Sequence, residues 1–152
     1  MRQRIYLDTS VIGGYLDKEF QVWSRQLFDE FKAGKKIAVI SDITLDELDN
    51  ARHEVRDLVK LIPEEAKEYV LSDEEAEDLA DDYLREGATT KKFREDALHI
   101  AIATINKVDV LVSWNFKHIV NLDRIKKYNG VNLKHRYSIL EIRNPREILN
   151  IK

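Results

Sequence analysis

The sequence predicts an α/β domain with three layers, in which helices cover both faces of a mostly parallel central sheet. Three short, continuous apolar runs, at residues 5–7, 37–40 and 110–112, have the character of strands that are buried on both faces. Between them lie longer segments whose apolar residues recur at helical spacing. Buried strands that alternate with helices are typical of a parallel sheet between two helical layers, an α/β/α arrangement.

The predicted helices lie between and after these strands. In order, they are a short helix before Gly13, a helix around residues 22–31, and helices over residues 44–60, 73–85, 95–106 and 116–127. Gly34 and Gly87 stand where two of them should end, and Thr44-Leu-Asp-Glu47 has the form of a capping box that opens another. A fourth strand is expected over residues 137–142, and Pro145 then occupies the first position of a last helical turn.

Length and composition limit the class of protein. The chain has 152 residues, of which 43% are hydrophobic and 35% charged, so we expect a single globular domain over residues 1–152. The absence of cysteine excludes disulfides, thiolate nucleophiles and cysteine-bound zinc, and it agrees with a cytoplasmic location. No apolar run approaches the roughly 20 residues of a membrane helix, and the N-terminus lacks the pattern of a signal peptide, so no membrane partner is expected.

Charge is distributed unevenly along the chain. Acidic residues dominate from Glu64 to Glu86, and basic residues dominate from Lys117 to Arg136. Each run is consistent with a solvated helix face, and the basic run is equally consistent with a surface that faces phosphate groups. The net charge of −3 does not by itself indicate a nucleic-acid partner.

Four oxygen-bearing side chains fall where the predicted strands end or where the adjoining helices begin. Asp8 follows the first strand, Glu47 lies at the start of the helix after the second, Asp96 opens the helix before the third, and Asn115 follows the third. Functional sites of parallel sheets gather beyond the carboxyl ends of the strands, so we expect these side chains to converge there. Oxygen ligands of this kind suit Mg²⁺ or Mn²⁺, which can activate water and offset charge at phosphorus.

Each of the four residues also has a structural interpretation. Asp8 and Asn115 are both suited to cap a following helix, and Glu47 to complete the capping box that Thr44 begins. Asp96 is an acid in a first helical turn, where the helix dipole favours negative charge. The metal interpretation therefore depends on the four residues meeting at one sheet edge.

Further side chains near this edge allow two interpretations each. His99 lies one turn after Asp96, and a hydrogen-bonded structural histidine is favoured over a substrate contact. Trp114 is suited either to stack on a base or to fill the core. Lys117 and His118 are suited either to contact phosphate or to begin a solvated helix.

Four segments together resemble the PIN-domain nucleases in their order and spacing: residues 5–11, 41–48, 96–103 and 109–118. The resemblance implies a PIN-like α/β/α domain that cleaves single-stranded RNA with Mg²⁺ or Mn²⁺, as an endoribonuclease. Many members of this size are VapC-type toxins of type II toxin–antitoxin pairs. The resemblance thus also implies a small antitoxin protein as partner and a homodimer.

The resemblance assigns roles residue by residue. Asp8, Glu47 and Asp96 match the first three acids, which hold the metal and act in catalysis, and Ser10 matches the accessory Ser or Thr beside the substrate. Asn115 stands where most members have a fourth acid, and it offers an oxygen ligand without charge. This departure leaves an alternative open, a PIN-fold binding or scaffold protein with weak or lost nuclease activity.

Overall fold

The computed structural model describes residues 1–149 and confirms the predicted fold class. Its sheet has five strands in the order β3-β2-β1-β4-β5, and all neighbouring strands are parallel. The strands are β1 (Gln3–Leu7), β2 (Lys36–Ser41), β3 (Lys67–Val70), β4 (Val110–Val112) and β5 (Ile142–Arg143). Because β1 lies at the centre, the residue that follows it stands in the middle of the carboxyl edge of the sheet.

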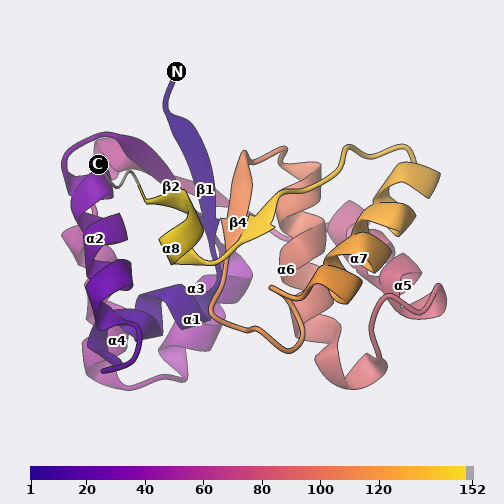
Figure 1. The fold of residues 1–152 in the computed structure, drawn as a ribbon, viewed down its shortest axis with the longest axis horizontal. Coiled ribbons are helices and arrows are strands. Elements are labelled where there is room, and N and C mark those ends of the chain that lie inside the picture. The colour runs from indigo at the N-terminus through magenta and orange to yellow at the C-terminus, as the bar shows by residue number, and fades with distance from the viewer. Residues whose placement is uncertain (150–152) are drawn as a thin grey trace.

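Helices occupy most of the remaining chain (Figure 1). The α-helices are α1 (Thr9–Gly13), α2 (Gln21–Lys32), α3 (Asp42–Asp49), α4 (His53–Asp57), α5 (Glu74–Arg85), α6 (Arg94–Ile105), α7 (Leu122–Lys134) and α8 (Pro145–Ile148). Short 3₁₀ turns are η1 (Gly14–Leu16), η2 (Leu58–Leu61), η3 (Glu64–Ala66) and η4 (Lys91–Phe93).

The sheet separates two hydrophobic cores, because successive side chains of a strand point to opposite faces. On β1, Ile5 and Leu7 join the core that contains α1, α2 and η2, whereas Tyr6 joins the core that contains α5, α6 and α7. Figure 1 shows these two groups of helices on opposite sides of the sheet. The three predicted layers are therefore present, and both faces of the central strands are buried.

The predicted helix over residues 44–60 is wrong in its start and in its continuity. The cap is Ser41, whose Oγ accepts a hydrogen bond from the backbone N–H of Thr44 at 3.1 Å, so α3 begins at Asp42. The chain then leaves the helix after Asp49 and restarts as α4 and η2. Ser41, at the last position of a buried strand, is as suitable a cap residue as Thr44. The capping-box pattern of Thr44–Glu47 favoured Thr44 in the prediction.

Three more differences concern α7, β5 and β3. The helix expected over residues 116–127 is α7, which begins only at Leu122 because the Asn121 side chain caps it. The strand expected over residues 137–142 shrinks to β5, and β3 was not predicted because its pattern, Lys-Glu-Tyr-Val, belongs to a half-exposed edge strand. The helices over residues 73–85 and 95–106 and the proline-led turn at Pro145 are confirmed within one residue at each end.

Among residues 1–149, every helix is too short or too polar to cross a lipid bilayer.

Candidate active site

The three predicted acids come from three elements that meet at the carboxyl edge of the sheet, the lower edge in Figure 1. Asp8 directly follows β1, Glu47 lies on α3, and Asp96 lies in the first turn of α6. The imidazole of His99, one turn after Asp96, connects two of them: its Nε2 atom is hydrogen-bonded to Glu47 and lies 3.7 Å from Asp8 Oδ1. The structure thus places Asp8 and Glu47 around one ring.

Asp8 is buried and held by hydroxyl groups. Its Oδ2 atom accepts hydrogen bonds from Ser10 at 2.7 Å and from Ser113 at 2.8 Å. It makes no side-chain cap to α1, so its capping role is not realised. Ser113 follows β4 at the level where Asp8 follows β1, because Leu7 pairs with Val112. The two serines fix one oxygen of the carboxylate and leave Oδ1 directed toward the space beside His99.

Glu47 is oriented by a chain of buried polar groups. His99 is almost fully buried, and its Nδ1 lies 2.6 Å from the Tyr6 hydroxyl, which in turn lies 2.7 Å from Ser41 Oγ. Ser41 donates to Thr44 Oγ1, and Thr44 donates to the carbonyl of Leu7. The structural interpretation of His99 is therefore confirmed, and this histidine also fixes the side chain of a candidate ligand.

The charge state of His99 follows from its neighbours. Burial lowers its pKa, but Tyr6, the hydrogen bond to Glu47 and the charge of Asp8 together outweigh burial and hold the pKa well above its ordinary value. An imidazolium donates from both nitrogens, so Nε2–H donates to Glu47 and Nδ1–H to Tyr6. Without an ion, this imidazolium offsets part of the negative charge of the site.

The pKa of Asp96 reflects both its burial and the other acids of the site. Burial, followed by the charge of Asp8, raises the pKa of Asp96 to about 6, with Glu47 adding to the rise and His99 opposing it. The carboxyl groups of Asp8 and Glu47 are therefore close enough to repel that of Asp96. A bound divalent cation would remove this repulsion, and carboxylate oxygens are the ligands that Mg²⁺ and Mn²⁺ prefer.

The three acids are nevertheless spread more widely than a compact ligand set. Among the described residues, three side chains whose ligand atoms all lie within 4.8 Å of one another occur at Asp82 on α5, Glu86 directly after α5 and His135 directly after α7. Arg85 and Lys134 already pair with the acids of that group. Wider spacing at Asp8, Glu47 and Asp96 still suits Mg²⁺, which keeps several waters and takes one or two carboxylates directly.

Asn115 lies at the same edge, but its side chain is hydrogen-bonded to a residue nearby in the sequence. Its Oδ1 accepts a hydrogen bond from the backbone N–H of His118 at 3.0 Å, and its own backbone N–H donates to Ser113 at 2.9 Å. Asn115 therefore closes a turn and does not cap a helix, because α7 begins only at Leu122 and is capped by Asn121. A second lone pair of Oδ1 and the Nδ2 group remain to face a ligand or a water.

The two predicted substrate contacts after Asn115 lie on the loop between β4 and α7. Lys117 is exposed, and the ring of His118 stacks on Phe93 with centroids 3.6 Å apart. Burial lowers the pKa of His118, and so do the positive charges of Arg124, Lys117 and Lys92. A cluster of basic side chains thus gathers beside the acidic edge.

A cavity of about 420 Å³ opens on the other side of Asn115. Its walls include Ser10, Phe20, Arg52 and Trp114. Trp114 is almost fully buried, so the core interpretation of this residue is largely realised, although it also borders the cavity. The Ser10 hydroxyl accepts from the backbone N–H of Trp114 at 2.9 Å, which ties this wall to Asp8.

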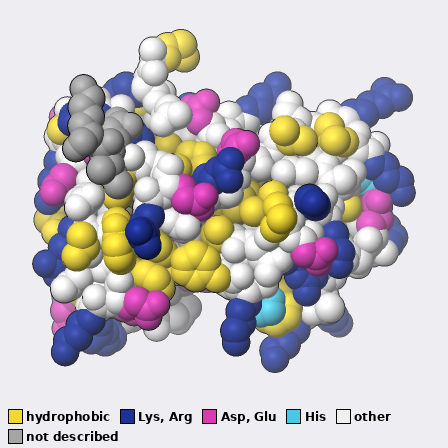
Figure 2. Space-filling view, in the orientation of Figure 1, with side chains coloured by type: hydrophobic (Ala, Val, Ile, Leu, Met, Phe, Trp, Pro, Cys, Tyr) yellow, Lys and Arg dark blue, Asp and Glu magenta, His cyan; other side chains and the backbone are white. Residues whose placement is uncertain are grey.

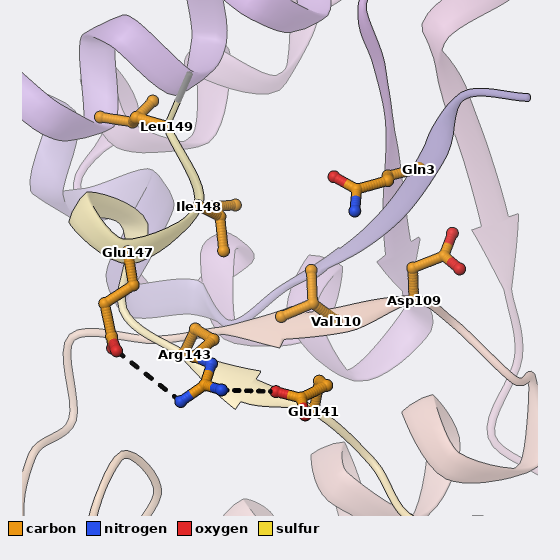
Figure 3. Close-up of a pocket in the computed structure, with 8 residues that line it drawn as sticks. All are labelled: Gln3, Asp109, Val110, Glu141, Arg143, Glu147, Ile148 and Leu149. Atoms are coloured by element: carbon orange, nitrogen blue, oxygen red, sulfur yellow. Dashed lines mark ion pairs between the residues drawn. The ribbon is translucent and has the colours of Figure 1, made fainter. Parts of the chain in front are cut away.

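A second hollow of about 320 Å³ lies away from the acids, at the amino end of β1 and β4 (Figure 3). Arg143 extends across it and pairs with Glu141 at 3.0 Å and with Glu147 at 3.8 Å. Asp109, a third acid in its wall, accepts a hydrogen bond from the backbone N–H of Arg4 at 2.7 Å, so each acid of this hollow has a partner within the protein.

The sequence did not single out Ser113, Tyr6 or Ser41 as parts of the site. A usable signal existed for Ser113, because it follows a parallel strand just as Asp8 does, and parallel strands end at a common edge. Tyr6 and Ser41 gave no such signal. A tyrosine within a buried apolar strand and a serine at a strand end have many structural uses.

The five-stranded parallel sheet flanked by helices is a PIN-like α/β fold. No protein-family model matches the chain, and no curated protein sequence matches it. A chain in the crystal structure of VapBC2 from Rickettsia felis bound to a DNA fragment from their promoter does match in structure, with a TM-score of 0.58 and 14% sequence identity. The match covers 93% of this chain and 98% of that chain, and at this identity it shows a common fold.

Proposed function

We propose that residues 1–152 form one domain that acts as a metal-dependent endoribonuclease on single-stranded RNA and serves as the toxin of a type II toxin–antitoxin pair. The observation that carries the nuclease proposal is the meeting of Asp8, Glu47 and Asp96 at one sheet edge, where burial and then the charges of Asp8 and Glu47 raise the pKa of Asp96 to about 6. The fold similarity to a chain of VapBC2 supports the toxin role, with a small antitoxin and a second copy of the chain as partners.

In this proposal Asp8, Glu47 and Asp96 hold Mg²⁺ or Mn²⁺, and Asn115 adds a neutral oxygen. When bound, the ion supplies an acidified water and offsets negative charge at the phosphorus. Ser10 and Ser113 fix Asp8 by their hydrogen bonds, and His99 fixes Glu47. Lys117 and His118 bind backbone phosphates, and the products carry 5′-phosphate and 3′-hydroxyl ends.

The direct test is the substitution Asp8→Asn, which keeps the size of the side chain and removes its charge. We expect it to abolish Mg²⁺-dependent cleavage of single-stranded RNA while circular dichroism and the urea midpoint stay near those of the wild type. Asp46→Asn is the matched control, because Asp46 is exposed and neighbours Glu47 without belonging to the site. Full activity of Asp8→Asn would refute the mechanism.

A second candidate is a PIN-fold binding or scaffold protein with weak or lost nuclease activity. The neutral Asn115 favours it, because its Oδ1 is engaged by the His118 backbone and brings no charge to the ion. Such a protein would show no specific Mn²⁺ site at Asp8 and no metal-dependent cleavage over a panel of structured RNAs.

A further inference from the structure

The cavity beside Ser10 and Asn115 has features that the metal site does not explain. Its volume of about 420 Å³ lies within the range of small-molecule sites. It adjoins Asp8 through the Ser10 hydroxyl, which bonds to Asp8 on one side and to the backbone of Trp114 on the other. Whatever occupies the cavity therefore lies next to the acids.

Aromatic rings form one wall of this cavity. Phe20 stacks on Trp114 with ring centroids 4.2 Å apart and an interplanar angle of 17°. Trp114 is fixed by a hydrogen bond from Nε1 to Ser24 at 3.0 Å. Phe116 lies about 6 Å from both rings and is 46% exposed, so it extends the aromatic surface into solvent. Rigid aromatic faces of this kind bind nucleobases by stacking, whatever the base.

Positive charge flanks this aromatic surface on both sides. Arg52 lines the cavity together with Asp17, and its guanidinium forms no ion pair with a carboxylate in the part of the chain that the structure describes. Beyond Asn115 lie Lys117, Lys92 and Arg124, the basic groups around His118. Figure 2 shows apolar side chains gathered near the segment that follows β4, with Lys and Arg side chains close by. Alternating basic and aromatic groups match a chain of alternating phosphates and bases.

We propose that this cavity binds one unstacked nucleobase of a single-stranded RNA, next to the phosphate at the acidic edge. The proposal rests on the nuclease function proposed above and adds a base subsite to it. Phe20 and Phe116 contact the base, and Arg52 and Lys117 hold phosphates on either side of it. A base within a duplex is stacked on both faces and paired at its edge, so the cavity selects single strands.

Gly13 allows the cavity to be filled without disturbing the backbone. It lines the cavity with φ −60°, and a Cβ atom added to it would meet no atom within 4 Å. Gly13→Leu therefore places an apolar side chain in the space of the base. Gly130→Leu is the matched control, because Gly130 lies on α7 and an added Cβ there also meets no atom within 4 Å. Phe116→Ala tests the exposed ring separately.

The experiment measures cleavage of one single-stranded RNA and of a series in which each position in turn is abasic. For the wild type we expect one abasic position beside the cleaved bond to lower kcat/KM about tenfold, the loss of one stacked base. Gly13→Leu should lower kcat/KM of the unmodified RNA to a similar extent. In this variant, the abasic substitution at that position should lower kcat/KM no further. Phe116→Ala should act in the same direction, and Gly130→Leu should match the wild type.

A binding measurement separates the two proposals. Fluorescence anisotropy of the same RNAs in EDTA reports binding without cleavage. If the wild type fails to cleave but binds with the same dependence on abasic position and on Gly13, the base subsite stands and the nuclease proposal falls. If cleavage is metal-dependent but Gly13→Leu behaves like Gly130→Leu, or all abasic positions are equivalent, the base subsite is refuted. Metal-dependent cleavage without any effect of Gly13→Leu or of abasic position is also the result expected if the cavity binds a protein partner.

Discussion

The Nδ1 atom of His99 lies 2.6 Å from the hydroxyl of Tyr6, on the side of the ring opposite to Glu47. Tyr6 belongs to β1, the strand that ends at Asp8, and Glu47 belongs to α3. A single buried ring thus connects the central strand to two helices at the candidate active site. The orientation of Glu47 therefore depends on a residue that itself faces the hydrophobic core.

Removing the Tyr6 hydroxyl should destabilise the protein while preserving its packing. Tyr6→Phe leaves His99 Nδ1 without a buried partner and removes one of the hydrogen bonds of Ser41 Oγ, which should cost about 2 kcal/mol of unfolding free energy. Urea unfolding measures this cost. Tyr15→Phe is the control, because Tyr15 packs its ring against Phe28 and lies outside the chain of hydrogen bonds from His99 to Ser41. Equal midpoints for the two variants would show that the chain from His99 to Ser41 contributes nothing to stability.

Metal binding should depend on Asp8 and not on the compact group at the other end of the molecule. In a Mn²⁺ titration we expect binding at one locus that Asp8→Ala weakens at least tenfold. His135→Ala should leave the binding unchanged, because Lys134 and Arg85 already neutralise Glu86 and Asp82. The reverse pattern, with loss in His135→Ala alone, would move the metal site to Asp82, Glu86 and His135.

The raised pKa of Asp96 predicts a pH dependence of stability in the metal-free protein. Burial and Asp8 raise this pKa from 3.8 to about 6, so the folded state favours the neutral acid. The stability that the neutral Asp96 side chain adds to the folded state is fully present below pH 3.8 and is lost as the pH rises through about 6. Asp96→Asn lacks this titration. In EDTA, its unfolding free energy minus that of the wild type should therefore increase as the pH rises between these two values.

Glu95→Gln is the control for this measurement, since Glu95 is the exposed neighbour of Asp96. Its difference from the wild type should vary less with pH over the same interval. Saturating Mn²⁺ should abolish the pH dependence that Asp96 contributes, because the ion stabilises the carboxylate form. A pH-independent difference for Asp96→Asn in EDTA would contradict the proximity of the three acids.

Two adjacent glycines should respond oppositely to alanine. A Cβ atom on Gly14 would lie 2.6 Å from Ser24 Oγ and 2.7 Å from Trp114 Nε1, so Gly14→Ala must displace the buried indole. We expect a loss of about 1–3 kcal/mol, measured by urea unfolding. Gly13→Ala, at the same φ of −60° and with open space around its Cβ, should be neutral or slightly stabilising.

Local sequence patterns were sufficient to place Asp8 and two helix ends. Asp8 could be placed because it follows a short apolar strand, and the end of such a strand fixes its position at the sheet edge. Gly34 and Gly87 marked helix ends because both adopt positive φ, 73° and 79°, which other residues rarely accept. These signals depend on residues adjacent in sequence.

The features that were not predicted from the sequence depend on tertiary contacts. The Thr44–Glu47 pattern predicted a cap, but Glu47 instead bonds to His99, which lies on another helix. The start of α7 was placed too early because the apolar residues after Asn115 have helical spacing, while the Asn115 side chain caps a turn at His118. In the first case the contact with α6 decided between two plausible partners, and in the second the Asn121 side chain caps the helix instead.

The position of β1 in the middle of the sheet has a consequence for synthesis on the ribosome. Its neighbours are β2, which follows soon after it, and β4, which begins only at Val110. A nascent chain that has reached residue 90 holds Asp8 and Glu47 but neither Asp96 nor Ser113. One side of β1 then has no strand to pair with. The acidic edge is therefore assembled late in translation, and fragments that stop before α6 cannot carry it.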